Sequence, residues 1–386
     1  MTDTERKDMV DLIDRENPND FDAIFSMTNV DTAEVIHSVE DNADAIYTWD
    51  YEKGARPQLA KLYEKAKGGQ WNGETDLPWD TPVDQERAAT EEYEANGSLG
   101  TMIDFSGTGV EKWQAKDWIK FNMEAQNWGL SQFMHGEQGA LVCTAKIVET
   151  VPWIDAKYYA ATQVVDEARH VEVFAKYLDM KMTGSYPINV HLRMLLDDII
   201  RDPRWDMTYL GMQIMVEGLA LAAFGFMYQT TQDPLLKKLL RYVMSDEARH
   251  VAFGVISLKE AYLDMSEAEL LERQEFAFEA ALRMRDRFLQ QEVWERMGAD
   301  VSKIVPLVFD NPDRREFQHM LFTKIVPNLK KLGLLDAGSG WLRKKFGEIG
   351  VIQYEDWQDT AAEVDAFALT NELDAENTFG RRPANA

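Results

Sequence analysis

One short motif occurs twice in this chain of 386 residues. The pentapeptide Asp-Glu-Ala-Arg-His spans residues 166–170 and again residues 246–250. Glu137 lies 30 residues before Glu167, and Glu217 lies 30 residues before Glu247, so the second set is the first shifted by 80 positions. A repeated motif with a matched upstream partner requires two similar structural units, and this constrains the fold more than any composition value.

The spacing of 30 residues predicts two helical hairpins. An α-helix rises about 1.5 Å per residue, so antiparallel helices bring residues to the same height when these lie equally far from the turn. The first midpoint is Pro152, which cannot continue a helix. The second is Gln232, followed by Asp233-Pro234, a pair typical of a helix start. In each pentapeptide the glutamate and the histidine are three apart and share a helix face.

The two hairpins would present four carboxylates and two imidazoles at one level of a four-helix bundle. These candidate metal ligands are Glu137, Glu167, His170, Glu217, Glu247 and His250. Such sets hold pairs of iron or manganese ions in carboxylate bundles. Four carboxylates carry about −4, which matches two divalent ions. The alternative is a solvated charged helix face, but such a face has no reason to recur with matched upstream glutamates.

Three segments resemble the ligand helices of ferritin-like di-iron oxygenases: residues 136–140, 165–170 and 245–250. The chain is most similar to hydroxylase subunits of bacterial multicomponent monooxygenases and, more distantly, to small subunits of class I ribonucleotide reductase. The resemblance covers about residues 111 to 264. It implies a ferritin-like bundle that uses two iron ions to activate dioxygen, with a mixed manganese/iron pair as an alternative.

The residues beside the ligands suggest how the histidines are oriented. Asp166 and Asp246 directly precede ligand glutamates and can accept the free N–H of a ligand histidine. The resemblance implies that each aspartate serves the histidine of the other helix pair. Arg169 and Arg249 would then neutralise the aspartates, although surface pairing along one helix explains these two arginines equally well.

We expect an all-α fold without separate domains, because no run of residues shows the period-two alternation of a strand. Residues 1–110 would form an N-terminal extension or cap, residues 111–265 the di-iron bundle, and residues 266–386 a C-terminal helical extension. Thr108 and Glu111 form a capping-box pattern that predicts the start of the first ligand helix. The third ligand helix would run from about Trp205 to Thr230, and a helix capped by Ser266 would reach about Met297.

Composition restricts the partners. A net charge of −26 and a pI near 4.6 argue against nucleic-acid binding and suit docking to a partner with a basic patch. A single cysteine excludes an intramolecular disulfide. The N-terminus has no apolar segment typical of a secretion signal, and no uninterrupted apolar stretch reaches membrane-spanning length. These features predict a cytoplasmic protein, and we also expect a homodimer.

Residues one or two turns from the ligands predict a substrate pocket. The apolar candidates are Phe133, Ala140, Phe174, Leu221 and Phe224, and Gln213 is the polar exception. Each such residue is more often core than pocket, but a group of them around a metal pair favours a nonpolar substrate.

Three positions depart from the resembled proteins. Phe174 stands where ribonucleotide reductase small subunits carry a radical tyrosine. Leu221 stands where many monooxygenase hydroxylases have a threonine, and Val243 where arylamine N-oxygenases carry an extra histidine ligand. Phe174 disfavours a reductase-like radical function, and Val243 disfavours nitrogen oxidation. Leu221 implies that oxygen activation differs from that of the hydroxylases.

The sequence therefore predicts an O2-dependent di-iron oxidoreductase that monooxygenates a small apolar organic substrate. The catalytic residues would be the metal-binding carboxylates of Glu137, Glu167, Glu217 and Glu247. A reductase or ferredoxin would supply electrons. A desaturase, an oxidase or an N-oxygenase on the same centre remains the alternative within enzymes. Outside that class stand a ferroxidase or iron-storage protein and a metal-free helical scaffold.

Overall fold

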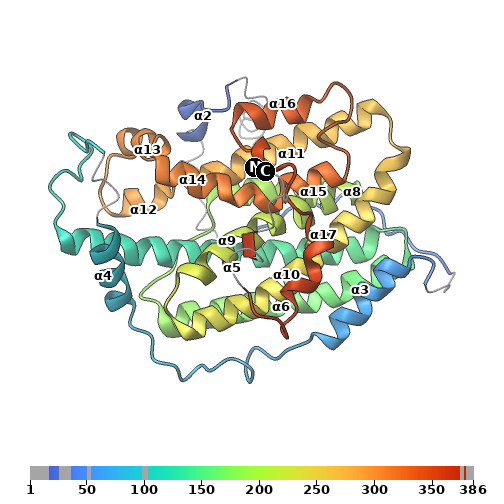
Figure 1. The fold of residues 1–386 in the computed structure, drawn as a ribbon, viewed down its shortest axis with the longest axis horizontal. Helices are drawn as coiled ribbons and strands as arrows, with labels where there is room; N and C mark the ends of the chain where they lie inside the picture. Colours follow the sequence, from blue (N-terminus) through green and yellow to red (C-terminus); the bar gives the residue numbers. More distant parts are fainter. Residues whose placement is uncertain (1–16, 26–35, 50–53, 98–102, 374–377, 380–386) are drawn as a thin grey trace.

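The computed structural model describes residues 17–25, 36–49, 54–97, 103–373 and 378–379 (Figure 1). In these residues every regular element is a helix and none is a strand, which confirms the all-α prediction. Most of the N-terminal segment 1–35 and most of the expected C-terminal tail lie outside the described residues.

Four long helical segments form the bundle that carries the repeated motif. They are α5 (Ala115–Thr150), α6 (Ile154–Lys181), the composite segment of α8 (Trp205–Tyr209), η1 (Leu210–Val216) and α9 (Glu217–Thr230), and α10 (Pro234–Ala261). Helix α5 packs along α6, and α9 packs along α10, so the chain forms the two hairpins expected from the spacing. Figure 1 shows α5, α6 and α10 running alongside one another through the middle of the molecule.

Both hairpin turns fall at the predicted midpoints. Helix α5 ends at Thr150, and α6 begins at Ile154 after a short extended link that contains Pro152. In the second hairpin, the Asp233 side chain accepts hydrogen bonds from two backbone amides in the first turn of α10, and Pro234 occupies the first helical position. Proline and the capping carboxylate therefore fix the chain reversals.

Two predicted helix boundaries are wrong. Helix α5 begins at Ala115, where Gln114 and Asp117 form the capping box, rather than at Thr108. Glu111 instead accepts a hydrogen bond from the backbone N–H of Gly109. Both pairs have the spacing of a capping box, so the pattern does not choose between them.

The helix capped by Ser266 also ends earlier than predicted. Helix α11 (Glu267–Arg287) stops ten residues before Met297, and Gln290 has φ 56°, in the left-handed region. A left-handed residue outside glycine marks a forced chain reversal. A new helix, α12 (Gln291–Arg296), follows it.

Shorter elements cover the bundle. The remaining helices are α2 (Phe21–Phe25), α3 (Pro57–Gly68), α4 (Gln85–Asn96), α7 (Val190–Arg201), η2 (Tyr262–Asp264), α13 (Val301–Phe309), α14 (Pro312–Met320), η3 (Leu321–Lys324), α15 (Val326–Lys331), α16 (Trp341–Glu348), η4 (Ile352–Tyr354), α17 (Thr360–Glu363) and η5 (Val364–Phe367). Helix α3 packs on α6 and α10, α4 packs on α5, and α17 packs on α10. These elements cover part of the outer surface of the bundle, while Val142 on α5 and Val165 on α6 stay exposed.

The segment Trp205–Thr230 is the one described helix that is long and apolar enough to cross a membrane. In its most apolar window, 83% of the residues are buried inside the protein. Packing on η3, α10 and α11 accounts for this burial, so its apolar character is that of a core helix.

Candidate metal centre

All four bundle helices contribute side chains to one buried cluster. Glu137 comes from α5, Glu167 and His170 from α6, Glu217 from α9, and Glu247 and His250 from α10. All six side chains are almost completely buried. Their ligand atoms form two overlapping groups, one of Glu137, Glu167, His170 and Glu247 and one of Glu167, Glu217 and His250.

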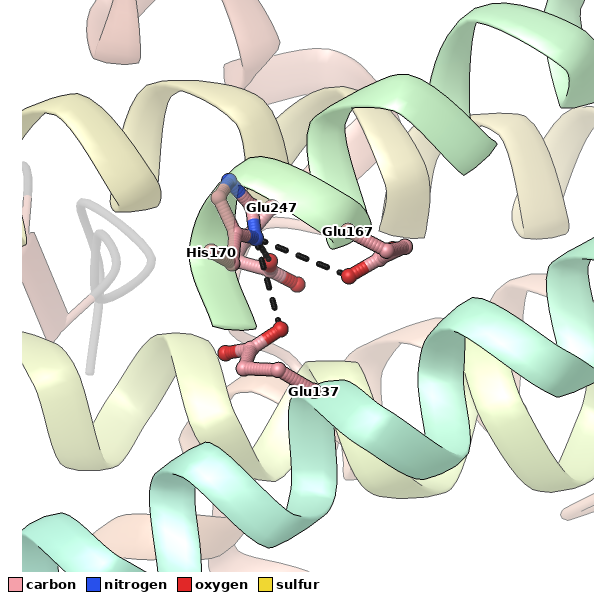
Figure 2. Close-up of side chains that lie close together, drawn as sticks. All are labelled: Glu137, Glu167, His170 and Glu247. Atoms are coloured by element: carbon pink, nitrogen blue, oxygen red, sulfur yellow. Dashed lines mark hydrogen bonds and ion pairs between the residues drawn. The ribbon is translucent and has the colours of Figure 1, made fainter. Parts of the chain in front are cut away.

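The first group surrounds His170, as Figure 2 shows. Its Nδ1 lies 3.0 Å from Oε1 of Glu247, 3.3 Å from Oε2 of Glu137 and 3.5 Å from Oε2 of Glu167. One imidazole nitrogen thus faces carboxylates from three different helices, a set of donors that suits a divalent ion.

The second group surrounds His250. Its Nδ1 lies 3.1 Å from Oε1 of Glu167, 3.6 Å from Oε1 of Glu247 and 4.0 Å from Oε2 of Glu217. Glu167 and Glu247 therefore approach both histidines. Two bound ions could therefore share these two carboxylates. Glu137 lies near His170 only, and Glu217 lies near His250 only.

Several ligand atoms in the cluster have no hydrogen-bond partner among the residues that the structure describes. They are Oε2 of Glu167, Oε2 of Glu217, both carboxylate oxygens of Glu247 and Nδ1 of His250. Leaving a buried polar atom unsatisfied costs about 1–3 kcal/mol, and more for a charged group. Lone pairs that converge without donors are what a pair of divalent cations would satisfy, so the residues fit a two-metal centre.

Each histidine is oriented by the opposite hairpin. Nε2 of His170 on α6 lies 3.1 Å from Oδ2 of Asp246 on α10. Nε2 of His250 on α10 lies 3.4 Å from Oδ2 of Asp166 on α6. An aspartate accepts only from a protonated nitrogen, so both contacts favour a proton on Nε2 and direct Nδ1 of each ring towards the carboxylates.

Two arginines join the aspartates into one buried network. Nη2 of Arg169 lies 2.5 Å from Oδ1 of Asp166 and 3.1 Å from Oδ2 of Asp246. Arg249 pairs with Asp246 and lies 3.8 Å from Asp166. Both arginines are buried, so the surface-pairing alternative is wrong. The two guanidinium charges balance the two aspartates.

Three polar neighbours of the cluster were not predicted from the sequence. Trp71 donates its indole N–H to Oδ2 of Asp246 at 2.7 Å, and Gln70 donates to Oδ1 of Asp166 at 2.9 Å. Both come from the loop after α3, far away in sequence, and no motif indicates them. Gln163 donates to Oε1 of Glu167 and to Oε1 of Glu217. It lies four residues before Glu167 on the same helix face, and this spacing is a signal that could have identified it.

Burial and neighbouring charges shift the pKa values in opposite directions. Burial raises the pKa of Glu137 and of Glu217 well above the ordinary value, with further increases from Glu247 and Glu167 respectively. Burial alone would also raise the pKa of Glu167, but the neighbouring His250 and His170 hold this pKa below its ordinary value. Among Glu137, Glu167 and Glu217, Glu167 is therefore ionised most readily, and it contacts both histidines.

The histidine pKa values rise even though burial opposes this. For His170 the carboxylates of Asp246 and Glu137 overcome burial, and for His250 those of Glu167 and Glu247 do. Without metal, the histidines and two of the glutamates therefore hold protons more tightly than they would in water.

The third ligand helix contains a segment with a wider winding. Residues 210–216 form η1, a π-helical segment that ends directly before Glu217. Such wide turns occur mostly as single insertions in α-helices and often at functional sites. Gln213, one of the predicted pocket residues, lies in this segment with both amide atoms buried and unpartnered. It does not line the cavity described next.

A narrow cavity of about 20 Å³ adjoins the cluster. Among the predicted pocket residues, Phe133, Ala140 and Phe224 line it, together with Glu137, Glu217 and Glu247. Leu221 and Phe174 do not line it, and both are fully buried. The Phe174 ring stacks behind Phe224, at 5.6 Å between ring centres. Arg287, which the sequence analysis did not single out, also lines the cavity.

Searches with the sequence find no matching protein-family model and no matching curated protein. Similar solved structures include R2-like ligand-binding oxidases with a reconstituted Mn/Fe cofactor. One variant, reconstituted anaerobically, is 17% identical with a TM-score of 0.46, over 72% of this chain and 94% of that chain. Another, reconstituted aerobically, is 16% identical with a TM-score of 0.43, over 79% and 95%. At these values the metal centre rests on the geometry of this chain alone.

Proposed function

We propose that this protein is an oxidoreductase that activates dioxygen at a two-metal centre held by Glu137, Glu167, His170, Glu217, Glu247 and His250. The observation that carries the proposal is the convergence of these buried ligand atoms, several of which lack any hydrogen-bond partner. Two iron ions suit the mixed carboxylate and imidazole donors, and a manganese/iron pair suits them as well.

The metal pair supplies the redox chemistry when it is bound. The protein residues bind and orient it. Glu167 and Glu247 face both histidines and are placed to be shared, while Asp166 and Asp246 hold the histidine protons on Nε2. The rings of Phe133 and Phe224, 4.7 Å apart between centres, exclude water from the side of the cavity.

The reaction that we propose is monooxygenation of a small organic molecule with an apolar body. The aromatic lining of the cavity favours such a substrate. A reductase or ferredoxin would return two electrons in each cycle, and the net charge of −26 suits a partner with a basic docking patch. We further propose a cytoplasmic homodimer with the three-part division of the chain given above.

A desaturase or oxidase on the same centre is the alternative within this class, because the ligand geometry is common to all of them. A ferroxidase would need no organic substrate. The cavity beside the ligands favours an organic reaction over iron storage, since storage requires no apolar pocket at the metal pair.

Metal content and oxygen use test the proposal together. The purified protein is expected to bind two metal ions per chain, and His250→Ala should lose at least one of them because a ligand atom is removed. His191→Ala, which removes another buried histidine outside the cluster, is the matched control and should keep both. Anaerobically reduced protein supplied with an electron donor should consume oxygen over many turnovers.

Full metal content in His250→Ala would refute the site. Oxygen uptake that stops at the amount of iron present, whatever donor and organic compound are added, would instead favour the ferroxidase.

A further inference from the structure

Arg287, the last residue of α11, is a buried cation without a partner. Only 3% of its surface is exposed. Its guanidinium forms no ion pair and no hydrogen bond with any residue that the structure describes, and its Nε is unsatisfied. The nearest aromatic contact is the ring of the adjacent Phe288, 4.7 Å away. Burial lowers the pKa of Arg287 to about 9, so the side chain is still charged at neutral pH.

The other arginines of α11 all have carboxylate partners. Arg273 pairs with Asp206, Arg283 with Asp198, and Arg285 with Asp286. Burying a guanidinium without such a partner is unfavourable, so the exception at Arg287 requires an explanation. A cation in the last turn of a helix gains something from the helix dipole, but that gain is small beside the cost of burial.

Arg287 lines the same cavity as Glu137, Glu217 and Glu247. The rest of that lining is mainly apolar and includes Phe133, Ala140, Val216, Ala220 and Phe224. The cavity therefore offers a fixed positive charge, a hydrocarbon surface and the ligand cluster to one small molecule.

The charges around the centre leave one positive charge unmatched. Asp166 and Asp246 are balanced by Arg169 and Arg249. The four glutamates of the cluster would be balanced by two divalent ions. The charge on Arg287 remains, and a single negative charge on a ligand would match it.

We propose that Arg287 binds the carboxylate of the substrate, which is a small organic monocarboxylic acid with an apolar body. This inference rests on the proposed function and specifies its substrate class. The planar guanidinium matches a carboxylate with two parallel hydrogen bonds. With the acid group held at Arg287, the hydrocarbon part lies against the phenylalanine rings and presents a carbon atom to the metal ligands.

The present cavity is close to the size of one water molecule. A carboxylic acid must therefore move side chains as it enters, and Phe133 and Phe224 are the two phenylalanines of the lining. Short or flat acids should therefore bind more tightly than long or branched acids.

Equilibrium binding to the metal-loaded protein tests the proposal. The probes are acetate and benzoate, each compared with its uncharged amide, acetamide or benzamide, by calorimetry at neutral pH. The native protein should bind benzoate at least about tenfold more tightly than benzamide, in keeping with a charge-assisted pair. Arg287→Met should remove this preference. Arg287→Lys should fold in any case, and it should weaken benzoate at least about tenfold while leaving benzamide unchanged, because the paired hydrogen bonds are lost.

Arg314→Met is the matched control. Arg314 is partly buried, and its burial likewise lowers its pKa to about 10, but it does not line the cavity. This variant should keep the preference for benzoate.

Three results would overturn the proposal. Equal affinity for acid and amide in the native protein is one. Unchanged benzoate binding in Arg287→Lys is another, because the acid would then be held by the metals. Displacement of benzoate by chloride as readily as by acetate is the third, since the site would then accept any small anion. Metal content in the same samples separates the outcomes: a loaded protein without acid preference refutes this inference alone, and a protein that binds no metal refutes the proposed function.

Discussion

Individual residues in the cluster hold protons that a metal ion must displace. The pKa values of Glu137 and Glu217 are raised above 4.5, and those of His170 and His250 above 6.5. Each of these groups therefore binds a proton more tightly in the folded metal-free protein than in the unfolded chain. The stability that these protons contribute is complete at low pH and is lost as the pH rises through the raised values.

Metal binding should consequently release protons. We expect the affinity for Mn²⁺ to rise with pH around neutrality, by about tenfold per pH unit for each proton released. Calorimetric titrations in two buffers with different ionisation enthalpies measure the number of protons. Heats that do not depend on the buffer, together with an affinity that does not change with pH, would contradict the protonated cluster.

At this scale the sequence predicted the ligands better than their surroundings. The repeated spacing identified all six residues that the structure brings together, because helix geometry converts spacing directly into position. It could not identify Trp71 or Arg287, since their places depend on how a loop and α11 pack onto the bundle. Phe174 was taken for a pocket residue because it shares a face with Glu167, but Phe224 stands between it and the cavity.

Among the elements, the third bundle helix has its predicted bounds and one feature that was not predicted. It spans Trp205–Thr230 as expected, and within it residues 210–216 are π-helical. Nearly all residues of this segment are apolar, so the sequence shows no hydrophobic periodicity that would distinguish a π-helix from an α-helix. By contrast, Ser266 and Glu269 predicted the start of α11 correctly, because a capping box acts through local hydrogen bonds.

The π-helical segment fits against α10 through a glycine. A Cβ atom added at Gly254 would lie 2.6 Å from Cβ of Gln213 and 3.2 Å from Cδ1 of Ile214. The substitution Gly254→Ala should therefore displace the segment and destabilise the protein by about 1–3 kcal/mol. Because Glu217 follows the segment directly, metal affinity should fall as well. Denaturant unfolding and metal analysis measure the two effects.

Gly129→Ala is the control, since a Cβ at Gly129 in α5 would meet no atom within 4 Å. Alanine there should stabilise the helix by about 0.5–1 kcal/mol. Equal stability and equal metal affinity in the two variants would show that the close fit at Gly254 has no consequence.

In the whole molecule, a buried ion pair ties the C-terminal part of the chain together beside the bundle. Nζ of Lys324 in η3 donates to Oε2 of Glu363 in α17 at 2.6 Å, and both side chains are buried. Next to it, Asn328 bonds to both the side chain and the backbone of Thr360. Since η3 packs on α9 and α17 packs on α10, the pair links elements that cover both helices of the second hairpin.

Lys324→Met should break this buried ion pair and destabilise the protein by about 3–5 kcal/mol. The double variant Lys324→Met with Glu363→Leu should recover most of that loss. If the chain folds without separate domains, circular dichroism and tryptophan fluorescence should report one coincident unfolding transition for each variant. Two separated transitions would show that residues 266–386 unfold independently of the bundle.

The crossed contacts between aspartates and histidines also determine when, during synthesis of the chain, the cluster can be completed. His170 on the first hairpin depends on Asp246 of the second, and His250 on the second depends on Asp166 of the first. A growing polypeptide that has emerged only as far as the end of α6 carries three of the ligands, but it lacks the aspartate that orients its histidine. The complete set of donors, with each histidine held by its aspartate, therefore exists only after α10 has been synthesised and docked.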